Sequence, residues 1–394
     1  MPLTLPTDEL SSWIRLSLEP GLGPAQARGL LAAIGLPQDV YAASLGQLAG
    51  LLPPPLALQL KSPLADETRA AVDATLKWLD QPGHHLLTLA DPGYPRSLLD
   101  THDPPLLLYV NGAVPLLSRP GIAIVGARSA TVGGADNARA FARYLAEQGW
   151  SIVSGLALGI DAAAHEGALA AGSQGGGTVA VLGTGIDIVY PARNRGLAHR
   201  IAAEGALVSE FPLGTRALPH QFPRRNRLVA GLSRGVLVVE AARQSGSLIT
   251  ARLATEMGRE VFAIPGSIHS PLSRGCHALI RQGAKLVESG QDIHEELGAP
   301  GSSAAASAPD LLSPLEAPPL DEDAARVLDA LGHDPAHIDQ LAARSGMDLP
   351  RLNACLLELE LSDRVFRHED GRFQRRQAAV APTDQRLYDG RQPS

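Results

Sequence analysis

The chain has 394 residues, 45% of them hydrophobic, and is therefore long enough for two or three domains with substantial cores. Its net charge is −7, and no apolar run approaches the roughly 18 to 20 residues that span a bilayer, which argues against a membrane protein. The first residues do not resemble a signal peptide, and Cys276 and Cys355 fall in different predicted domains. These features predict a cytoplasmic protein without a disulfide framework.

The charge is distributed unevenly along the chain. Residues 119–281 contain 17 arginines, no lysine and 10 acidic residues, whereas the rest of the chain is strongly acidic. Because local charge steers a partner, the negative total does not exclude a polyanion bound by the middle of the chain. A high-GC genome, which favours arginine codons, would equally explain the absence of lysine.

Residues 1–80 predict a small helical domain of the sterile-alpha or helix-hairpin-helix type. Apolar residues recur three and four positions apart over 10–18 and 25–34, on either side of a Gly- and Pro-rich turn at 20–24. In such a hairpin, backbone amides at a helix start can meet a DNA phosphate. Only Arg15 and Arg28 could complete that contact, so a structural or partner-binding role is favoured.

Residues 81–298 predict an extended Rossmann-like, doubly wound and mainly parallel sheet. One or two edge strands are expected within 86–112. Short apolar runs then alternate with stretches of helical period, which is typical of buried parallel strands. The predicted strands cover 122–125, 151–153, 178–182, 206–209, 236–239, 261–264 and 285–287.

Glycine and serine follow most of these strands. Ligands of doubly wound sheets bind outside the carboxyl ends of the strands, so the turns predict an anion-binding rim, although each alone is ordinary turn chemistry. Residues 126–129 do not match the Gly-x-Gly-x-x-Gly fingerprint of dinucleotide folds, and no cofactor is expected. The candidate site residues in these turns are Gly126, Arg128, Ser129, Ser154, Gly155, Gly159, Ser245, Gly246 and Ser247.

A basic cluster precedes the strand at 236–239. An unpaired buried guanidinium is unfavourable, so we expect all its arginines to face water or an anion. Phe222 is a candidate for stacking on a base, with a buried core role as the alternative. The candidate residues of this cluster are Phe222, Arg224, Arg225, Asn226 and Arg227.

The acidic residues offer little chemistry. Asp161 and His165 stand four apart at a helix start and could form an acid–base pair, but an aspartate that caps the helix is the commoner arrangement. A nuclease would need clustered carboxylates for a metal ion, whereas Asp161, Asp187 and Glu240 are widely spaced. We therefore expect no metal site and no catalytic residue.

The remaining residues predict a linker at 299–320, a winged-helix domain at 321–376 and a disordered tail at 377–394. Three amphipathic segments, 323–331, 337–345 and 349–361, precede a hairpin at 365–373. The helix expected to read DNA carries Glu358 and Glu360 with only Arg351 in compensation. That charge does not suit a phosphate backbone, so a protein-binding or structural role is favoured.

Several motifs in this order resemble the bacterial DNA-processing protein A (DprA/Smf) family. They occupy residues 104–112, 124–128, 154–165, 181–191, 222–227 and 245–251. The resemblance implies a sequence-independent single-stranded DNA-binding protein of natural transformation and recombination. Such a protein protects incoming DNA, loads the RecA recombinase, acts as a homodimer and has no known reaction.

Carried over by motif, the phosphate pocket would contain Gly126, Arg128, Ser154, Gly155, Gly159, Arg224, Arg225 and Arg227. Some relatives have a basic residue where this chain has Leu158, and Arg193 or Arg195 could take its place. An alternative is a nucleotide-binding enzyme similar to the lysine-decarboxylase-like phosphoribohydrolases. Those enzymes carry a Pro-Gly-Gly-x-Gly-Thr block before a catalytic glutamate, whereas Glu240 precedes the Gly-Ser turn here.

Overall fold

The computed structural model describes residues 5–300, 321–332, 335–362, 364–368 and 371–375. The chain forms two compact units, Met1–Gly301 and Ser302–Ser394, each described here by itself. Most of the predicted linker at 299–320 and the whole predicted tail at 377–394 lie outside the described residues. No helix in the described ranges is long and apolar enough to cross a membrane.

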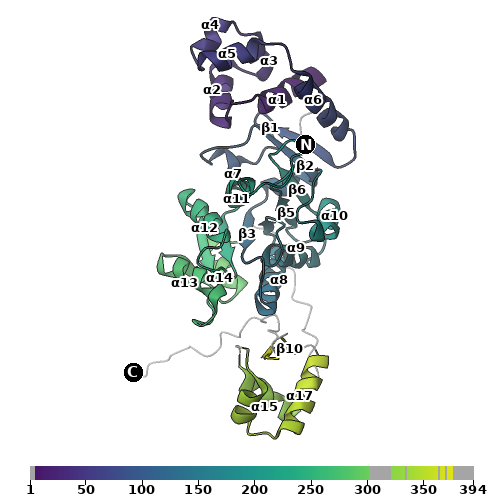
Figure 1. Cartoon of the computed structure of the whole chain (residues 1–394), viewed down its shortest axis with the longest axis vertical. Helices are drawn as coiled ribbons and strands as arrows, with labels where there is room; N and C mark the ends of the chain where they lie inside the picture. Colours follow the sequence, from purple (N-terminus) through teal and green to yellow (C-terminus); the bar gives the residue numbers. More distant parts are fainter. Residues whose placement is uncertain (1–4, 301–320, 333–334, 363, 369–370, 376–394) are drawn as a thin grey trace, which may run out of the picture. The chain divides into compact units, whose positions relative to one another are not determined.

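A nine-stranded sheet forms the centre of the first unit (Figure 1), in the order β1-β2-β6-β5-β4-β3-β7-β8-β9. The strands from β6 to β9 in this order are parallel, and β2 is antiparallel to both of its neighbours. The predicted doubly wound fold is therefore confirmed. The strands are β1 His84–Thr88, β2 Leu107–Gly112, β3 Gly121–Val125, β4 Ser151–Ser154, β5 Thr178–Val181, β6 Ala206–Ser209, β7 Gly235–Val238, β8 Glu260–Ala263 and β9 Lys285–Leu286.

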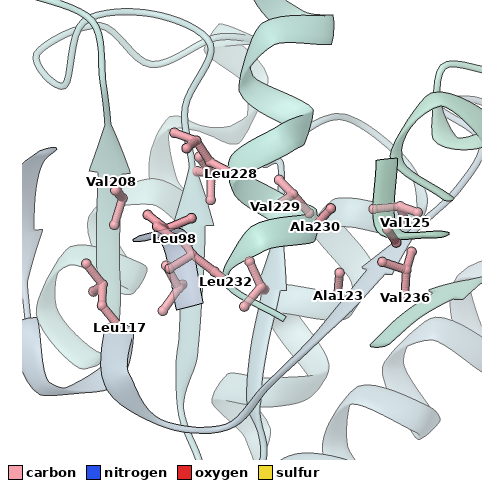
Figure 2. Close-up of a cluster of buried hydrophobic side chains, with 14 of the residues drawn as sticks. Leu98, Leu117, Ala123, Val125, Val208, Leu228, Val229, Ala230, Leu232 and Val236 are labelled. Atoms are coloured by element: carbon pink, nitrogen blue, oxygen red, sulfur yellow. The ribbon is translucent and has the colours of Figure 1, made fainter. Parts of the chain in front are cut away.

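Helices cover both faces of the sheet, so alternate residues of each strand enter different cores. In β3, Ile122 and Ile124 pack against Phe141, whereas Ala123 and Val125 share a core with Leu228 (Figure 2). Burial on both faces explains why the strands are continuous apolar runs in the sequence. The first face carries α8 Val132–Glu147, α9 Ile160–Ala170, α10 Arg195–Glu204 and α14 Gly290–Leu297; the second carries α7 Arg96–Leu99, α11 Gln221–Gly231, α12 Ser247–Glu256 and α13 Arg274–Arg281.

The two strands that precede β3 extend the sheet at one side. One or two edge strands were expected in this segment, and β1 is the one at the edge, because β2 lies between β1 and β6. Residues Leu107 to Val110 of β2 are all buried, which an edge strand with one open side would not require.

Six helices precede β1 and share a core with this side of the sheet. Trp13 and Leu16 belong to the same buried cluster as Leu107 and Tyr109 of β2. Trp78 stacks on His84 of β1 with ring centroids 4.2 Å apart. The helical segment is thus joined to the sheet by apolar packing. Its helices are α1 Thr7–Leu18, α2 Pro24–Ile34, α3 Pro37–Ala42, α4 Leu45–Ala49, α5 Pro54–Lys61 and α6 Asp66–Leu79.

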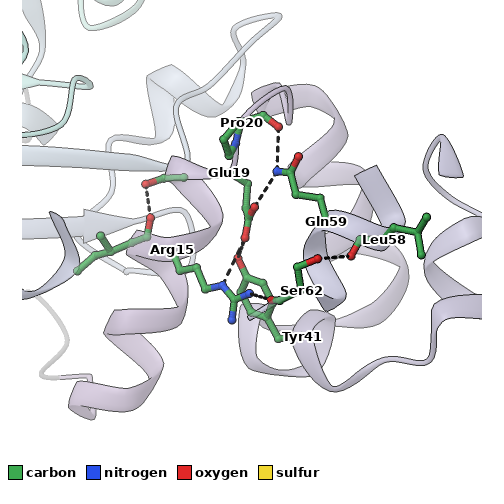
Figure 3. Close-up of polar contacts among 9 residues, drawn as sticks. Arg15, Glu19, Pro20, Tyr41, Leu58, Gln59 and Ser62 are labelled. Atoms are coloured by element: carbon green, nitrogen blue, oxygen red, sulfur yellow. Dashed lines mark hydrogen bonds and ion pairs between the residues drawn. The ribbon is translucent and has the colours of Figure 1, made fainter. Parts of the chain in front are cut away.

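The two arginines of the helical hairpin form hydrogen bonds to other groups of the protein. Glu19 accepts hydrogen bonds from Arg15 Nε (3.3 Å), Tyr41 Oη (3.0 Å) and Gln59 Nε2 (2.9 Å), as Figure 3 shows. Burial, together with the charge of Glu19, raises the pKa of Tyr41. Arg28 Nη2 donates to the carbonyl oxygen of His102 at 3.0 Å. These contacts favour the structural role of the hairpin over a phosphate contact.

The second unit has the predicted winged-helix arrangement. Helices α15 Glu322–Leu331, α16 Ile338–Ser345 and α17 Leu349–Leu361 precede the antiparallel strands β10 Val365–Arg367 and β11 Phe373–Arg375. Its own core includes Val327, Leu341, Leu352 and Phe373. On α17, Arg351 Nε donates to Asp323 Oδ2 at 2.6 Å, so the one cation of the predicted reading helix is ion-paired.

Candidate functional site

A pocket of about 510 Å³ lies at the carboxyl ends of β3, β4 and β7. Strands β4, β5 and β6 lie on one side of β3, and the next strand in the sequence, β7, lies on its other side. The pocket therefore occupies the point at which the strand order reverses. Doubly wound sheets bind their ligands at this point. The pocket is lined mainly by Gly126, Arg128, Gly155, Ala157, Asp161, Tyr190, Phe222, Arg225, Asn226, Ser245, Gly246, Ser247 and Thr250.

Arg225 forms the floor of this pocket and not its rim. The residue is 5% exposed, and its Nη1 donates to the backbone carbonyls of Gly155 and Val181. Burial lowers the pKa of Arg225 to about 10, opposed by the charge of Asp161, so the guanidinium stays protonated at neutral pH. The expectation that all three arginines face water or a bound anion was wrong for Arg225, whose hydrogen bonds go to backbone carbonyls inside the protein.

The other two arginines of the cluster share one buried carboxylate. Glu210, whose side chain is 2% exposed, accepts hydrogen bonds at Oε2 from Arg227 and from Arg224 Nη2, the latter at 3.1 Å. Burial raises the pKa of Glu210, while the charges of Arg227 and Arg224 act in the opposite direction. Only Arg224, at 48%, has a substantially exposed side chain. The predicted basic cluster thus contains three arginines in three different environments.

Cations without an ion pair lie in the turns after other strands. Arg128, in the turn after β3, is exposed, and its guanidinium lies 5.7 Å from the centroid of the Phe222 ring. Arg193 and Arg195 follow β5 and are also exposed. None of the three forms an ion pair with any residue in the described part of the chain. Leu158 is 36% exposed and brings no charge to the rim.

Two aromatic rings meet at the mouth of the pocket. Phe222 is half-buried, and its ring centroid lies 5.5 Å from that of Tyr190, which is 49% exposed. An exposed ring beside an unpaired arginine is suited to stacking on a base while the arginine meets a phosphate. Sequence reasoning missed Tyr190 as a site residue. The signal was its place in the motif at 181–191, which begins at the last residue of β5.

The small residues divide into those that line the pocket and those that support it. Ser154 is fully buried, and its Oγ donates to the carbonyl oxygen of Ile124 at 2.7 Å, which links β4 to β3. Gly159 has φ of +76°, and a Cβ there would lie 2.3 Å from Ala127 O. Ser245 Oγ and Ser247 Oγ are 2.7 Å apart at the start of α12. Of the predicted residues, Ser129, Ser154, Gly159, Arg224 and Arg227 do not line this pocket.

The two residues of the possible acid–base pair serve the fold. Asp161 Oδ2 accepts hydrogen bonds from the amides of Gly155 (3.1 Å) and Ala157 (3.3 Å). His165 is fully buried, with Nδ1 2.8 Å from Thr178 Oγ1, and burial lowers its pKa to about 3. A histidine that stays neutral in a dry core is not available for general acid–base catalysis at neutral pH.

Glu240 binds the start of a helix and does not line the pocket. Its carboxylate accepts hydrogen bonds from Thr131 N (2.9 Å) and Thr131 Oγ1 (2.5 Å). Thr131 in turn caps α8 by accepting a hydrogen bond from Gly134 N at 2.9 Å. The glutamate therefore anchors a helix start. Over the described ranges, no group of three or more His, Cys, Asp or Glu residues could hold a metal ion.

Comparisons with known proteins match this chain over both units. A family described as DNA recombination-mediator protein A matches residues 85–298, and the DprA winged helix domain matches residues 312–371. Protein Smf of Escherichia coli is 43% identical over 75% of this chain and 78% of that protein. Protein Smf of Synechocystis sp. is 34% identical over 93% of this chain and 99% of that protein.

A solved structure of DNA processing protein A from Streptococcus pneumoniae superposes on this chain with a TM-score of 0.63 at 38% identity, and covers 75% of this chain and 99% of that one. The family match at residues 85–298 includes the strands whose carboxyl ends form the pocket. The chain therefore belongs to the DprA/Smf family of DNA-processing proteins.

Proposed function

We propose that this protein binds single-stranded DNA without sequence preference, along the carboxyl edge of the sheet. The observation that carries the proposal is the exposed, unpaired Arg128 beside the rings of Phe222 and Tyr190 in the pocket. Phosphates and the faces of bases are common to all nucleotides, so a site that uses only these groups has little sequence preference.

The same geometry supports a preference for single strands over duplexes. A base can enter a pocket and stack on a side chain only when it is free of its neighbours, whereas the bases of a duplex remain stacked and paired. Arg193 and Arg195 follow β5 and Arg243 follows β7, at the same edge of the parallel sheet. All three are exposed, and their charges would favour a strand that extends beyond the pocket.

Protection of incoming DNA, loading of the RecA recombinase in natural transformation and recombination, and action as a homodimer complete the proposal. The resemblance to the DprA/Smf family supports these parts. The bonds of Glu240 to Thr131, and its place outside the lining of the pocket, count against the phosphoribohydrolase alternative. Release of a free base from a nucleoside monophosphate by the purified protein would favour that enzyme instead.

The test compares fluorescent oligothymidine with a duplex of equal length across a salt series, using the unchanged protein and Arg128→Ala. Loss of one phosphate contact is expected to weaken single-strand binding roughly tenfold and to make the salt slope shallower by about 0.7. Arg252→Ala is the matched control, since it removes the same charge from an arginine that is 72% exposed and paired with Glu256. Equal affinity for the duplex, or an unaffected Arg128→Ala variant, would contradict the proposal.

A further inference from the structure

A second pocket, of about 370 Å³, lies between the turn at Gly21–Pro24 and strands β2 and β6. Helix α11 contributes to both pockets. Phe222, Arg225 and Asn226 line the first, whereas Arg224 lines the second. Residues three or four apart share a helix face and residues two apart point in nearly opposite directions, so one helix turn presents side chains to both pockets.

The walls of the second pocket suit a flat apolar group next to an anion. Leu22, Leu107 and Phe211 provide apolar surface, and the Arg224 guanidinium lies 5.4 Å from the centroid of the Phe211 ring. The start of α2 also lines the pocket and has no acidic residue in its first turn. The half-exposed Arg224 favours a negatively charged ligand group.

Glu210 adds a buried acceptor to the same pocket. Both guanidinium contacts of this residue go to Oε2, and Oε1 is buried with no hydrogen-bond partner among the described residues. A buried carboxylate oxygen without a donor is unfavourable. Each DNA base carries an amino or imino N–H on its pairing edge, so any base could donate to this oxygen. A ligand that combines a flat ring, an N–H donor and a phosphate is a nucleotide.

We propose that the second pocket is a further nucleotide subsite for the same DNA strand. A base lies against Phe211 and donates an N–H to Glu210 Oε1, and the adjacent phosphate meets Arg224. This inference rests on the proposed function. It adds that a DNA strand held in the first pocket continues past α11 to the helical segment. There the carboxylate of Glu210 accepts a hydrogen bond from an N–H group that all four bases possess.

The first test separates the two pockets by oligonucleotide length and by Leu22→Trp, which fills the second pocket. Leu22→Trp is expected to weaken binding of oligothymidine of about 12 nucleotides roughly tenfold, and to leave one of about 4 nucleotides unaffected. Leu58→Trp, at a residue 56% exposed on α5, is the matched control and should change neither. Arg128→Ala should weaken both. Unchanged binding of the long strand by Leu22→Trp, or equal loss for both lengths, overturns the inference.

The second test removes the donor from the DNA and leaves the protein unchanged. An oligothymidine of about 12 nucleotides with N3-methylthymidine throughout lacks the imino N–H that Glu210 would accept. We expect the unchanged protein to bind it several-fold more weakly than unmodified DNA, and the Leu22→Trp variant to bind both alike. Equal binding by the unchanged protein overturns the role of Glu210. Absence of binding to any single strand overturns both this inference and the proposed function.

Discussion

The guanidinium of Arg225 lies at the floor of the first pocket, where it joins the turn after β4 to the end of β5. Its acceptors are 70 and 44 residues away in the sequence. Asp161 balances its charge and also binds two amides of the same turn. Arg225 is therefore a positioning residue, which shapes the site through the backbone and leaves phosphate contacts to exposed cations such as Arg128.

Arg225→Ala is expected to lower the free energy of unfolding by about 3 to 5 kcal/mol, because it leaves the buried carbonyls of Gly155 and Val181 without their donor and Asp161 without a nearby positive charge. Arg224→Ala removes a half-exposed arginine and should lower it by less than about 1 kcal/mol. Urea denaturation followed by circular dichroism measures both. A variant at Arg225 as stable as the unchanged protein would show that these hydrogen bonds do not hold the turn after β4 and the end of β5 together.

His165 predicts a pH dependence of stability. Burial lowers its folded-state pKa to about 3, whereas an unfolded histidine titrates near its model value of 6.5. Below that value the unfolded state binds a proton that the folded state does not, so stability falls from about pH 6.5 towards pH 3. At pH 4 this histidine should lower the free energy of unfolding by about 3 kcal/mol relative to neutral pH. A His165→Gln variant should lack that component in denaturation curves at pH 7 and pH 4, and an identical pH profile would contradict the assignment.

The turns after β3 and β4 act as one element because their backbones are in contact. Ile160 N donates to Ala127 O at 3.2 Å, and Gly159 approaches the same carbonyl so closely that no side chain fits. The position of Arg128 thus depends on the conformation of a turn that follows a different strand. Close approach of two backbones, and not glycine's flexibility alone, requires the glycine here.

Gly159→Ala should disturb both turns, since its Cβ would lie 2.3 Å from Ala127 O and 2.6 Å from Arg128 O. We expect stability to fall by more than about 2 kcal/mol and oligothymidine binding to weaken. Gly172→Ala is the matched control, with φ of +72° and open space around its Cβ. The Gly172→Ala variant should lose only about 1 to 2 kcal/mol in free energy of unfolding and should bind oligothymidine as tightly as the unchanged protein. Equal effects of the two substitutions on DNA affinity would contradict the coupling of the turns.

The strands of the sheet could be predicted from sequence because a parallel strand buried on both faces is a short, continuous apolar run. Such a run would be unfavourable on the surface of the protein. Ile122, Val153 and Val236 mark such strands without knowledge of their neighbours. The contacts of the basic cluster could not be predicted, because the acceptors of Arg225 and the ring of Tyr190 come from distant turns. Residues that lie far apart in the sequence meet at the sheet edge only after folding, and a single sequence does not indicate which of them come into contact.

At the scale of the whole molecule, the two units have separate cores and opposite electrostatic character at the surfaces considered for DNA. The pocket in the first unit has the exposed Arg128, whereas α17 in the second has Glu358 and Glu360 and an Arg351 that is paired with Asp323. We therefore expect DNA binding to belong to the first unit, and the winged-helix unit to contact a protein or to serve the fold.

A chain that ends at residue 301 should bind oligothymidine with an affinity within about threefold of the full chain and with the same salt slope, because no expected phosphate contact is removed. Fluorescence anisotropy across a salt series measures both quantities. The isolated residues 302–394 provide the complementary control and should bind weakly. Loss of more than about tenfold in the shortened chain would assign part of the DNA contact to the winged helix.

The strand order also determines when the centre of the molecule can form. β3 pairs with β4 soon after both are synthesised, but its other edge pairs with β7, which follows more than a hundred residues later. At typical elongation rates of about 5 to 20 residues per second, the ribosome needs roughly 5 to 20 s to supply β7. During that interval one edge of β3, which is buried along its whole length, has no partner. Nascent chains of this length are therefore where chaperone binding or aggregation is expected to be greatest.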